Sequence, residues 1–144
     1  MIWHESMRKK SSPAKKLTWK EKRDLDIEIG FLEGIIKRDP LYIDVLQILG
    51  DDYTRLGRFP DGLKVDENLA KLRPNDPLVH YNLACSYSLT KRLDLAALAL
   101  ERALALGYRD FKWLAEDPDL ENLRQDPVYR KIRVKLRILQ IKVR

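Results

Sequence analysis

The sequence is poor in the residue types that build disulfides and metal sites. Its 144 residues include one cysteine, Cys85, and two histidines, His4 and His80. A single cysteine cannot form a disulfide within the chain, and protein metal sites usually need several cysteine or histidine ligands. We therefore expect no disulfide, no bound metal and no other cofactor, and a reducing, cytoplasmic location.

Long apolar runs are also missing. No stretch reaches the roughly 18 apolar residues of a membrane-spanning helix, and the basic residues near the N-terminus are not followed by the apolar run of a signal peptide. We expect a protein that does not cross a membrane. With 6 glycines and 7 prolines, against 44% hydrophobic and 35% charged residues, the composition is typical of an ordered, helix-rich chain of one domain.

What the sequence does have is an uneven distribution of charge beneath its formal net charge of +6. Residues 1–24 carry 8 Lys and Arg against 3 Asp and Glu, which is +5. Residues 25–126 carry 13 against 19, which is −6, and residues 127–144 carry 7 against none, which is +7. The chain thus has an acidic body and two basic ends. Such a charge distribution affects which partners a protein binds more than which fold it adopts.

The sequence also contains an internal repeat with a period of 34 residues. In the first half of each copy, apolar residues recur at the helical spacing i, i+3, i+7, and a small residue marks the place where a neighbouring helix must approach closely. The second half of each copy again keeps a small residue. The coinciding pairs are Leu46 and His80, Leu49 and Leu83, Gly50 and Ala84, Tyr53 and Tyr87, Gly62 and Ala96, Leu69 and Ala103, and Leu72 and Leu106.

This pattern resembles the tetratricopeptide repeat over residues 43–108. The resemblance implies an all-α fold, a short right-handed solenoid of antiparallel helix pairs whose concave groove binds peptide segments of other proteins. The chain then divides into a basic arm over residues 1–17, a helical domain over 18–128 and a basic amphipathic helix over 129–144. Within the helical domain we expect a capping helix over 18–38, full repeats over 43–76 and 77–110, and a diverged closing segment over 111–128.

Local signals agree with this division. Thr18 and Glu21 form a capping-box pattern at the start of the expected capping helix. Gly57 and Gly107 are natural helix ends. Asp-Pro pairs offer a capping carboxylate followed by a proline suited to the first helical position, so each predicts a helix start or its approach. These pairs are Asp39-Pro40, Asp76-Pro77, Asp117-Pro118 and Asp126-Pro127.

The resemblance also assigns residues to the concave groove. Acidic and amide groups of the first repeat would lie beside an apolar, aromatic patch of the second, and the alternative interpretation is a solvated face without a ligand. Of the positions that grip a terminal carboxylate in some family members, only Asn82 matches, which disfavours an acidic C-terminal tail as ligand. The predicted groove residues are Asp44, Gln47, Asp51, Thr54, Leu78, Tyr81, Asn82, Cys85 and Ser88.

The stretch HYNLACSY over residues 80–87 gathers side chains that could be mistaken for an active site. His80 and Cys85 are separated by roughly 140° around a helix axis, so they cannot form a dyad. We expect His80 to be a partly buried core residue and Cys85 to act as a small hydrophobe. The chain offers no other set of nucleophile and base, so we expect no catalytic activity.

The C-terminal stretch is basic and apolar in alternation. Tyr129, Ile132, Leu136, Leu139 and Val143 fit a helical stripe, although residues 132–138 also alternate as an edge strand would, and we prefer the helix. It would serve either as a final capping helix or as a basic surface for an acidic protein, RNA or an anionic membrane. The basic residues are Arg130, Lys131, Arg133, Lys135, Arg137 and Lys142.

Together these features predict a protein-interaction adaptor without catalytic activity. The expected partner is another protein or peptide, with self-association through the C-terminal helix as a further possibility. The alternative function is a basic-tailed binder of nucleic acid or an anionic surface, with the repeats as scaffold. We disfavour nucleic acid because no stacking aromatic residues interleave the basic residues after Tyr129.

Overall fold

The protein is all-α, as predicted. The computed structural model describes residues 16–143, and within them only residues 16–18 precede the first helix. The expected arm over residues 1–17 therefore lies almost wholly outside the described residues. The elements, in chain order and with η for 3-10 helices, are α1 (Trp19–Arg38), α2 (Ile43–Leu56), α3 (Phe59–Leu72), α4 (Pro77–Leu89), α5 (Leu93–Ala105), α6 (Phe111–Glu116), η2 (Pro118–Leu120), α7 (Glu121–Gln125), η3 (Pro127–Tyr129) and α8 (Arg130–Val143).

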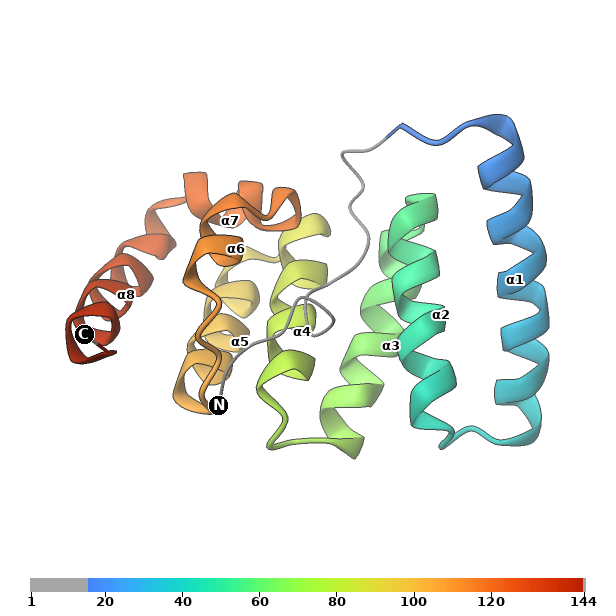
Figure 1. Ribbon diagram of the computed structural model, residues 1–144, viewed down its shortest axis with the longest axis horizontal. Coiled ribbons are helices and arrows are strands. Elements are labelled where there is room, and N and C mark those ends of the chain that lie inside the picture. Colours follow the sequence, from blue (N-terminus) through green and yellow to red (C-terminus); the bar gives the residue numbers. More distant parts are fainter. Residues whose placement is uncertain (1–15, 144) are drawn as a thin grey trace.

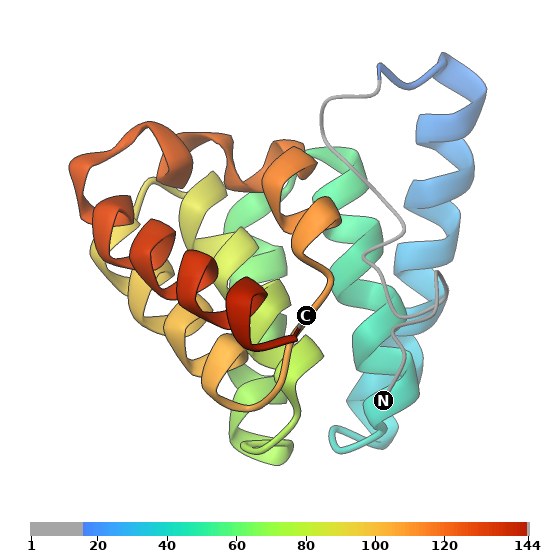
Figure 2. The same cartoon turned by 60° about the vertical axis from the view of Figure 1, so that its left-hand side comes forward.

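The first five helices stack side by side in chain order, each antiparallel to the one before (Figure 1). Helix α1 forms one end of the stack and α8 lies at the other (Figure 1). Beyond α5 the chain turns back: η2 and α7 contact α4, and α8 contacts α5 (Figure 2). None of the described helices combines the length and apolar character needed to span a bilayer.

The helix ends follow the signals in the sequence. The Thr18 hydroxyl accepts the backbone N–H of Glu21 at 3.1 Å, and the Asp76 carboxylate accepts that of Leu78 at 2.9 Å. Gly57 ends α2 with φ of 84°, a left-handed conformation that glycine adopts without strain. The second repeat has Lys91 at this position, with φ of 61°. The pair Asp39-Pro40 differs from the other three, because it ends α1 and α2 begins only at Ile43.

A tyrosine-to-glutamate hydrogen bond recurs with the repeat. The Tyr53 hydroxyl of α2 donates to Glu33 of α1 at 2.5 Å. One repeat later, the Tyr87 hydroxyl of α4 donates to Glu67 of α3 at 3.1 Å. The next glutamate of the series, Glu101 of α5, forms an ion pair with Lys135 of α8 at 3.3 Å. Helix α8 thus takes the partner that a further repeat would have taken, and ends the stack.

The buried apolar side chains form two clusters. One joins α1, α2 and α3 around Leu32, Leu49 and Val65, and it also contains Val79 of α4. The other joins α4 and α5 to everything that follows them, including Leu120 and Ile132. Both repeats are therefore packed on both sides: the first lies between α1 and the second repeat, and the second lies between the first repeat and the segments that follow α5.

Candidate functional site

The nine predicted groove residues do not share one open surface. Asp44 and Gln47 are exposed, and Asp51, Leu78 and Asn82 are half-buried. The other four are at most 1% exposed: Thr54, Tyr81, Cys85 and Ser88. The prediction that these four line an open groove is wrong, and the reason is different for the first repeat and the second.

In the first repeat, Thr54 lies between helices. Its hydroxyl donates to the backbone oxygen of Gly50 at 3.1 Å. A Cβ atom added to Gly62 of α3 would lie 3.1 Å from the same hydroxyl oxygen, which shows how closely α2 and α3 approach. Thr54 is therefore a packing residue of the α2–α3 contact.

In the second repeat, the closing segment covers the groove side of α4. The Tyr81 hydroxyl donates to Oδ2 of Asp117 at 2.7 Å. The Tyr81 ring is stacked on Tyr108, with 4.1 Å between centroids and 9° between planes. Burial raises the pKa of the Tyr81 phenol far above its ordinary value, so it stays a neutral donor. Tyr81 thus anchors the closing segment and cannot reach a ligand.

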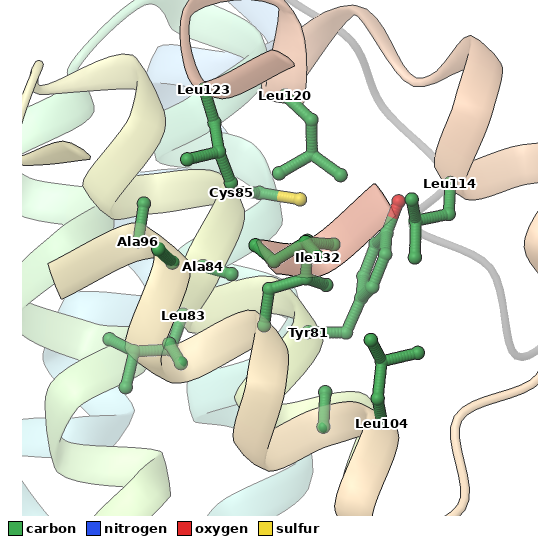
Figure 3. Packing of buried hydrophobic residues seen from close by; sticks show 14 of the residues in the cluster. Tyr81, Leu83, Ala84, Cys85, Ala96, Leu104, Leu114, Leu120, Leu123 and Ile132 are labelled. Atoms are coloured by element: carbon green, nitrogen blue, oxygen red, sulfur yellow. The ribbon is translucent and has the colours of Figure 1, made fainter. Parts of the chain in front are cut away.

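Cys85 and Ser88 serve the same contact. Figure 3 shows the Cys85 side chain beside Leu120 and Leu123 of the closing segment. Its thiol donates to Oδ2 of Asp117 at 3.6 Å. The Ser88 hydroxyl accepts the backbone N–H of Leu123 at 3.2 Å. His80 has a structural contact as well, because its Nε2 lies 2.8 Å from the backbone oxygen of Pro74.

One group of side chains has the composition of a metal site. A thiol and two carboxylates, from Cys85, Asp117 and Asp119, place one ligand atom each within 4.8 Å of the others, and all three residues are buried. The Asp117 carboxylate is already engaged, since Oδ1 accepts the Asp119 backbone N–H at 3.0 Å and Oδ2 accepts the Tyr81 hydroxyl. An ion would have to displace these hydrogen bonds. We therefore assign Asp117 two structural roles: its carboxylate caps η2, and it links the closing segment to α4 through the Tyr81 hydroxyl.

The groove side of α2 is exposed to solvent, unlike that of α4. Ile48 is 47% exposed, between the exposed Asp44 and the half-buried Asp51. Sequence reasoning missed Ile48, although it lies four residues after Asp44 and therefore next to it on the helix surface. The position of Ile48 in the second repeat belongs to Asn82, whose Oδ1 is buried and accepts no hydrogen bond from the described residues.

Helix α1 extends this exposed surface. Asp52 of α2 is only 4% exposed and has a side-chain hydrogen bond with Glu28 of α1. Burial, this hydrogen bond, and the negative charges of Glu28 and Asp51 raise the pKa of Asp52 to about 7, and Arg55 opposes them. Oδ2 of Asp52 has no partner within the described residues.

Residues three and four positions from Glu28 lie beside it on α1. Two of these, Asp24 and Phe31, are exposed, Phe31 to 69%, whereas Leu25 and Leu32 are buried. The two helices thus share a surface with acidic and large apolar side chains, which we name the α1–α2 face. It consists of Asp24, Glu28 and Phe31 of α1 and of Asp44, Gln47, Ile48, Asp51 and Asp52 of α2.

A hollow of about 980 Å³ opens between α1, α2 and α3. Apolar side chains of Leu46, Leu49 and Val65 contribute to its lining, together with the ring of Tyr53. Acidic and basic side chains line it in equal number, so its charge gives no preference for a partner of one sign. These charged residues are Glu33, Asp61, Glu67, Lys37, Lys64 and Lys71.

Helix α8 (Arg130–Val143) forms where the sequence predicts a basic helix rather than an edge strand. Tyr129 and Ile132 are buried and Leu136 and Leu139 half-buried, as their stripe predicts. Of the predicted basic residues, Arg130, Lys131, Arg133, Lys135 and Arg137 are exposed; Lys142 lies in α8, but its side chain is outside those described.

A second apolar stripe on α8 was not predicted. Val134, Ile138 and Ile141 are 52%, 48% and 66% exposed, at the spacing i, i+4, i+7. On a helical projection this stripe lies opposite the packed one. Helix α8 therefore carries apolar side chains on both of its faces, with cations between them.

Comparison with known proteins gives one distant relationship. No protein-family model matches the sequence. The chain is 35% identical over 79 residues to a protein of Arabidopsis thaliana whose name describes it as chloroplastic. The matched part is 53% of this chain but 24% of the relative, so the chain corresponds to about a quarter of that protein's length. The fold and the comparison together establish an all-α, repeat-like protein that is distantly related to this chloroplast protein.

Proposed function

We propose that the protein is a non-catalytic adaptor of the tetratricopeptide type, which binds a segment of another protein on the α1–α2 face. The observation that carries the proposal is the contrast between α2, whose groove side is open, and α4, whose groove side is covered by the closing segment. The face combines four exposed or half-buried carboxyl groups, and the buried one of Asp52, with the exposed Phe31 and Ile48. A partner with basic residues and apolar anchors fits this chemistry best.

The absence of catalysis is part of the proposal. The residues of HYNLACSY that offered a nucleophile or a base have packing and hydrogen-bonding roles, and Cys85 is 0% exposed. The cytoplasmic location remains a prediction, since the name of the Arabidopsis relative assigns that protein to the chloroplast.

Replacing one apolar side chain of the face tests the function. Ile48→Arg removes an apolar contact and places a cation among the carboxyl groups, where it competes with the basic residues of a partner. The matched control is Leu98→Arg, which makes the same kind of change at a 62% exposed position of α5 outside the face. We expect a partner captured by the full chain to bind Ile48→Arg at least about tenfold more weakly, while Leu98→Arg binds it normally. Equal binding by both variants would reject the α1–α2 face as the site.

Binding of nucleic acid by α8 is the second candidate, favoured by the exposed Arg130, Lys131 and Arg137. Two other cations have contacts within the chain: Lys135 pairs with Glu101 at 3.3 Å, and the Arg133 guanidinium lies 5.1 Å from the centre of the Tyr129 ring. If this function holds, RNA affinity should fall steeply with salt, by a slope of about 0.9 in log units for each phosphate neutralised on a duplex. Arg130→Ala with Arg137→Ala should make that slope shallower.

A further inference from the structure

The α1–α2 face has the properties of a receptor for a basic amphipathic helix. Its exposed Phe31 and Ile48 supply apolar contacts, and carboxyl groups of both helices surround them. Asp52, only 4% exposed, lies beneath this surface and adds to its acidic character. A helix that lays an apolar stripe into a groove and places cations at its rim matches such a surface.

Helix α8 of the same protein has these complementary properties. It has six Lys and Arg residues and no Asp or Glu over Arg130–Val143. The stripe of Val134, Ile138 and Ile141 is exposed, although another stripe of the same helix is packed on α5. The chain therefore has an acidic, apolar surface on α1 and α2 and a basic, apolar surface on α8.

The two surfaces cannot meet within one molecule. Figure 1 places α1 at one end of the stack and α8 at the opposite end, with α2 to α5 between them. We propose that α8 of one copy docks on the α1–α2 face of a second copy, so that the protein self-associates head to tail. This inference rests on the proposed function, because it names the ligand of the same face.

A contact of this kind joins two different surfaces, so it produces either a closed ring or dimer or an open array, depending on the rotation between copies. The contact is small, one helix against two, and belongs to the weak end of protein interfaces, for which we expect a dissociation constant of about 1 to 100 μM. Because opposite charges contribute at exposed positions, added salt should weaken it.

Two variants of the full chain, each with one surface broken, test the arrangement by sedimentation velocity over a series of concentrations. Ile48→Arg breaks the α1–α2 face and leaves α8 intact. Ile138→Glu breaks the α8 stripe and leaves the face intact. Leu98→Arg and Gln140→Glu are the matched controls, at exposed positions of α5 and α8 outside the two surfaces. Thermal unfolding of each variant establishes that it is folded.

We expect the unmodified chain and both controls to associate, and each broken variant to remain monomeric at the same concentrations. An equimolar mixture of the two broken variants should form a one-to-one dimer, because it contains one intact copy of each surface. A wild-type chain that stays monomeric up to about 1 mM would overturn the inference. Association that both variants retain, or a mixture that stays monomeric, would overturn it too.

The sedimentation experiment and the partner-binding experiment can fail independently of each other. If the chain is monomeric but a captured partner distinguishes Ile48→Arg from Leu98→Arg, the face binds a protein other than its own copy. If neither experiment responds to Ile48→Arg, the face is not a binding site.

Discussion

The two repeats share a backbone pattern but differ in what lies on their groove side. Position for position at the 34-residue period, Gln47, Ile48 and Asp51 of α2 correspond to Tyr81, Asn82 and Cys85 of α4. On α2 these side chains face outward; on α4 the closing segment covers Tyr81 and Cys85 completely. The repeat sequence therefore determines which face of a helix a side chain occupies, whereas a later segment of the chain determines whether that face is exposed to solvent.

The largest expected effect comes from removing the anchor of the closing segment. Tyr81→Ala deletes a buried ring that stacks on Tyr108 and donates to Asp117, and large aromatic truncations of this kind lower the free energy of unfolding by about 3 to 5 kcal/mol. The corresponding change in the first repeat, Gln47→Ala, should alter it by less than about 0.5 kcal/mol. Urea unfolding measures both. Similar losses for the two would mean that the repeats are packed alike.

The second-largest effect separates two roles of an aspartate: capping a 3-10 helix, and holding the closing segment to α4 by a hydrogen bond. Asp117→Ala removes an acceptor of the Tyr81 hydroxyl as well as the cap of η2, and we expect a loss of about 2 to 3 kcal/mol. Asp126→Ala removes the cap of η3, where the carboxylate accepts the Val128 N–H at 3.0 Å, and should cost about 1 kcal/mol. Equal losses by urea unfolding would show that the Asp117–Tyr81 bond adds nothing.

The buried Asp52 of the first repeat predicts that the stability depends on pH. The pKa of Asp52 is about 7 in the folded chain against an ordinary 3.8, so the folded state binds the proton more tightly than the unfolded state. Stability from this group is therefore present at low pH and declines as the pH rises from about 4 to 7. Glu28 and Asp51 strengthen this decline, and Arg55 reduces it.

Asp52→Asn should flatten that decline and raise the free energy of unfolding by about 1 kcal/mol above pH 7. Thermal unfolding over this pH range measures it. The residue at this position in the second repeat is Ser86, whose hydroxyl donates to the buried carboxylate of Asp66, so it is not a neutral control. The control is Gln47→Ala, at an exposed and uncharged position of α2, which should leave the slope unchanged. An Asp52→Asn variant with the wild-type slope would contradict the assignment.

The smallest effect concerns the turn after the first helix of each repeat. Gly57 and Lys91 both have a positive φ, 84° and 61°, and only glycine adopts it without strain. We expect Lys91→Gly to stabilise the chain by about 0.5 to 1 kcal/mol and Gly57→Ala to destabilise it by a similar amount. Thermal unfolding of the two variants, which should shift in opposite directions, provides the check.

Local signals in the sequence predicted most of the helix boundaries, because capping and left-handed turns depend on residues near one another. The Thr18 box, the Asp76-Pro77 start and the Gly57 end are of this kind. The groove of the second repeat could not be predicted from spacing, because what covers α4 lies more than thirty residues further along the chain. One signal was present: Pro77–Leu89 contains no Asp, Glu, Lys or Arg, and a helix without charge on any side is buried all round.

The face on α1 and α2 was only partly predictable. Asp44, Gln47 and Asp51 were assigned from the repeat pattern, but Glu28 and Phe31 of α1 were not, because the resemblance assigns a capping helix to packing alone. The contact between Glu28 and Asp52 is a tertiary one between two different helices. Neither composition nor periodicity places those two carboxyl groups together.

Thiol labelling tests the difference between the repeats most directly, since Cys85 is the only cysteine of the chain. Its counterpart at the 34-residue period is Asp51, so the chain with Cys85→Ser and Asp51→Cys moves the one thiol to the equivalent place on α2. Under native conditions we predict that Cys85 reacts with a maleimide about 100-fold or more slowly than the thiol at position 51, because Cys85 must wait for the closing segment to open. Equal labelling rates, with both chains folded, would show that the groove side of α4 is as open as that of α2 and would contradict the account.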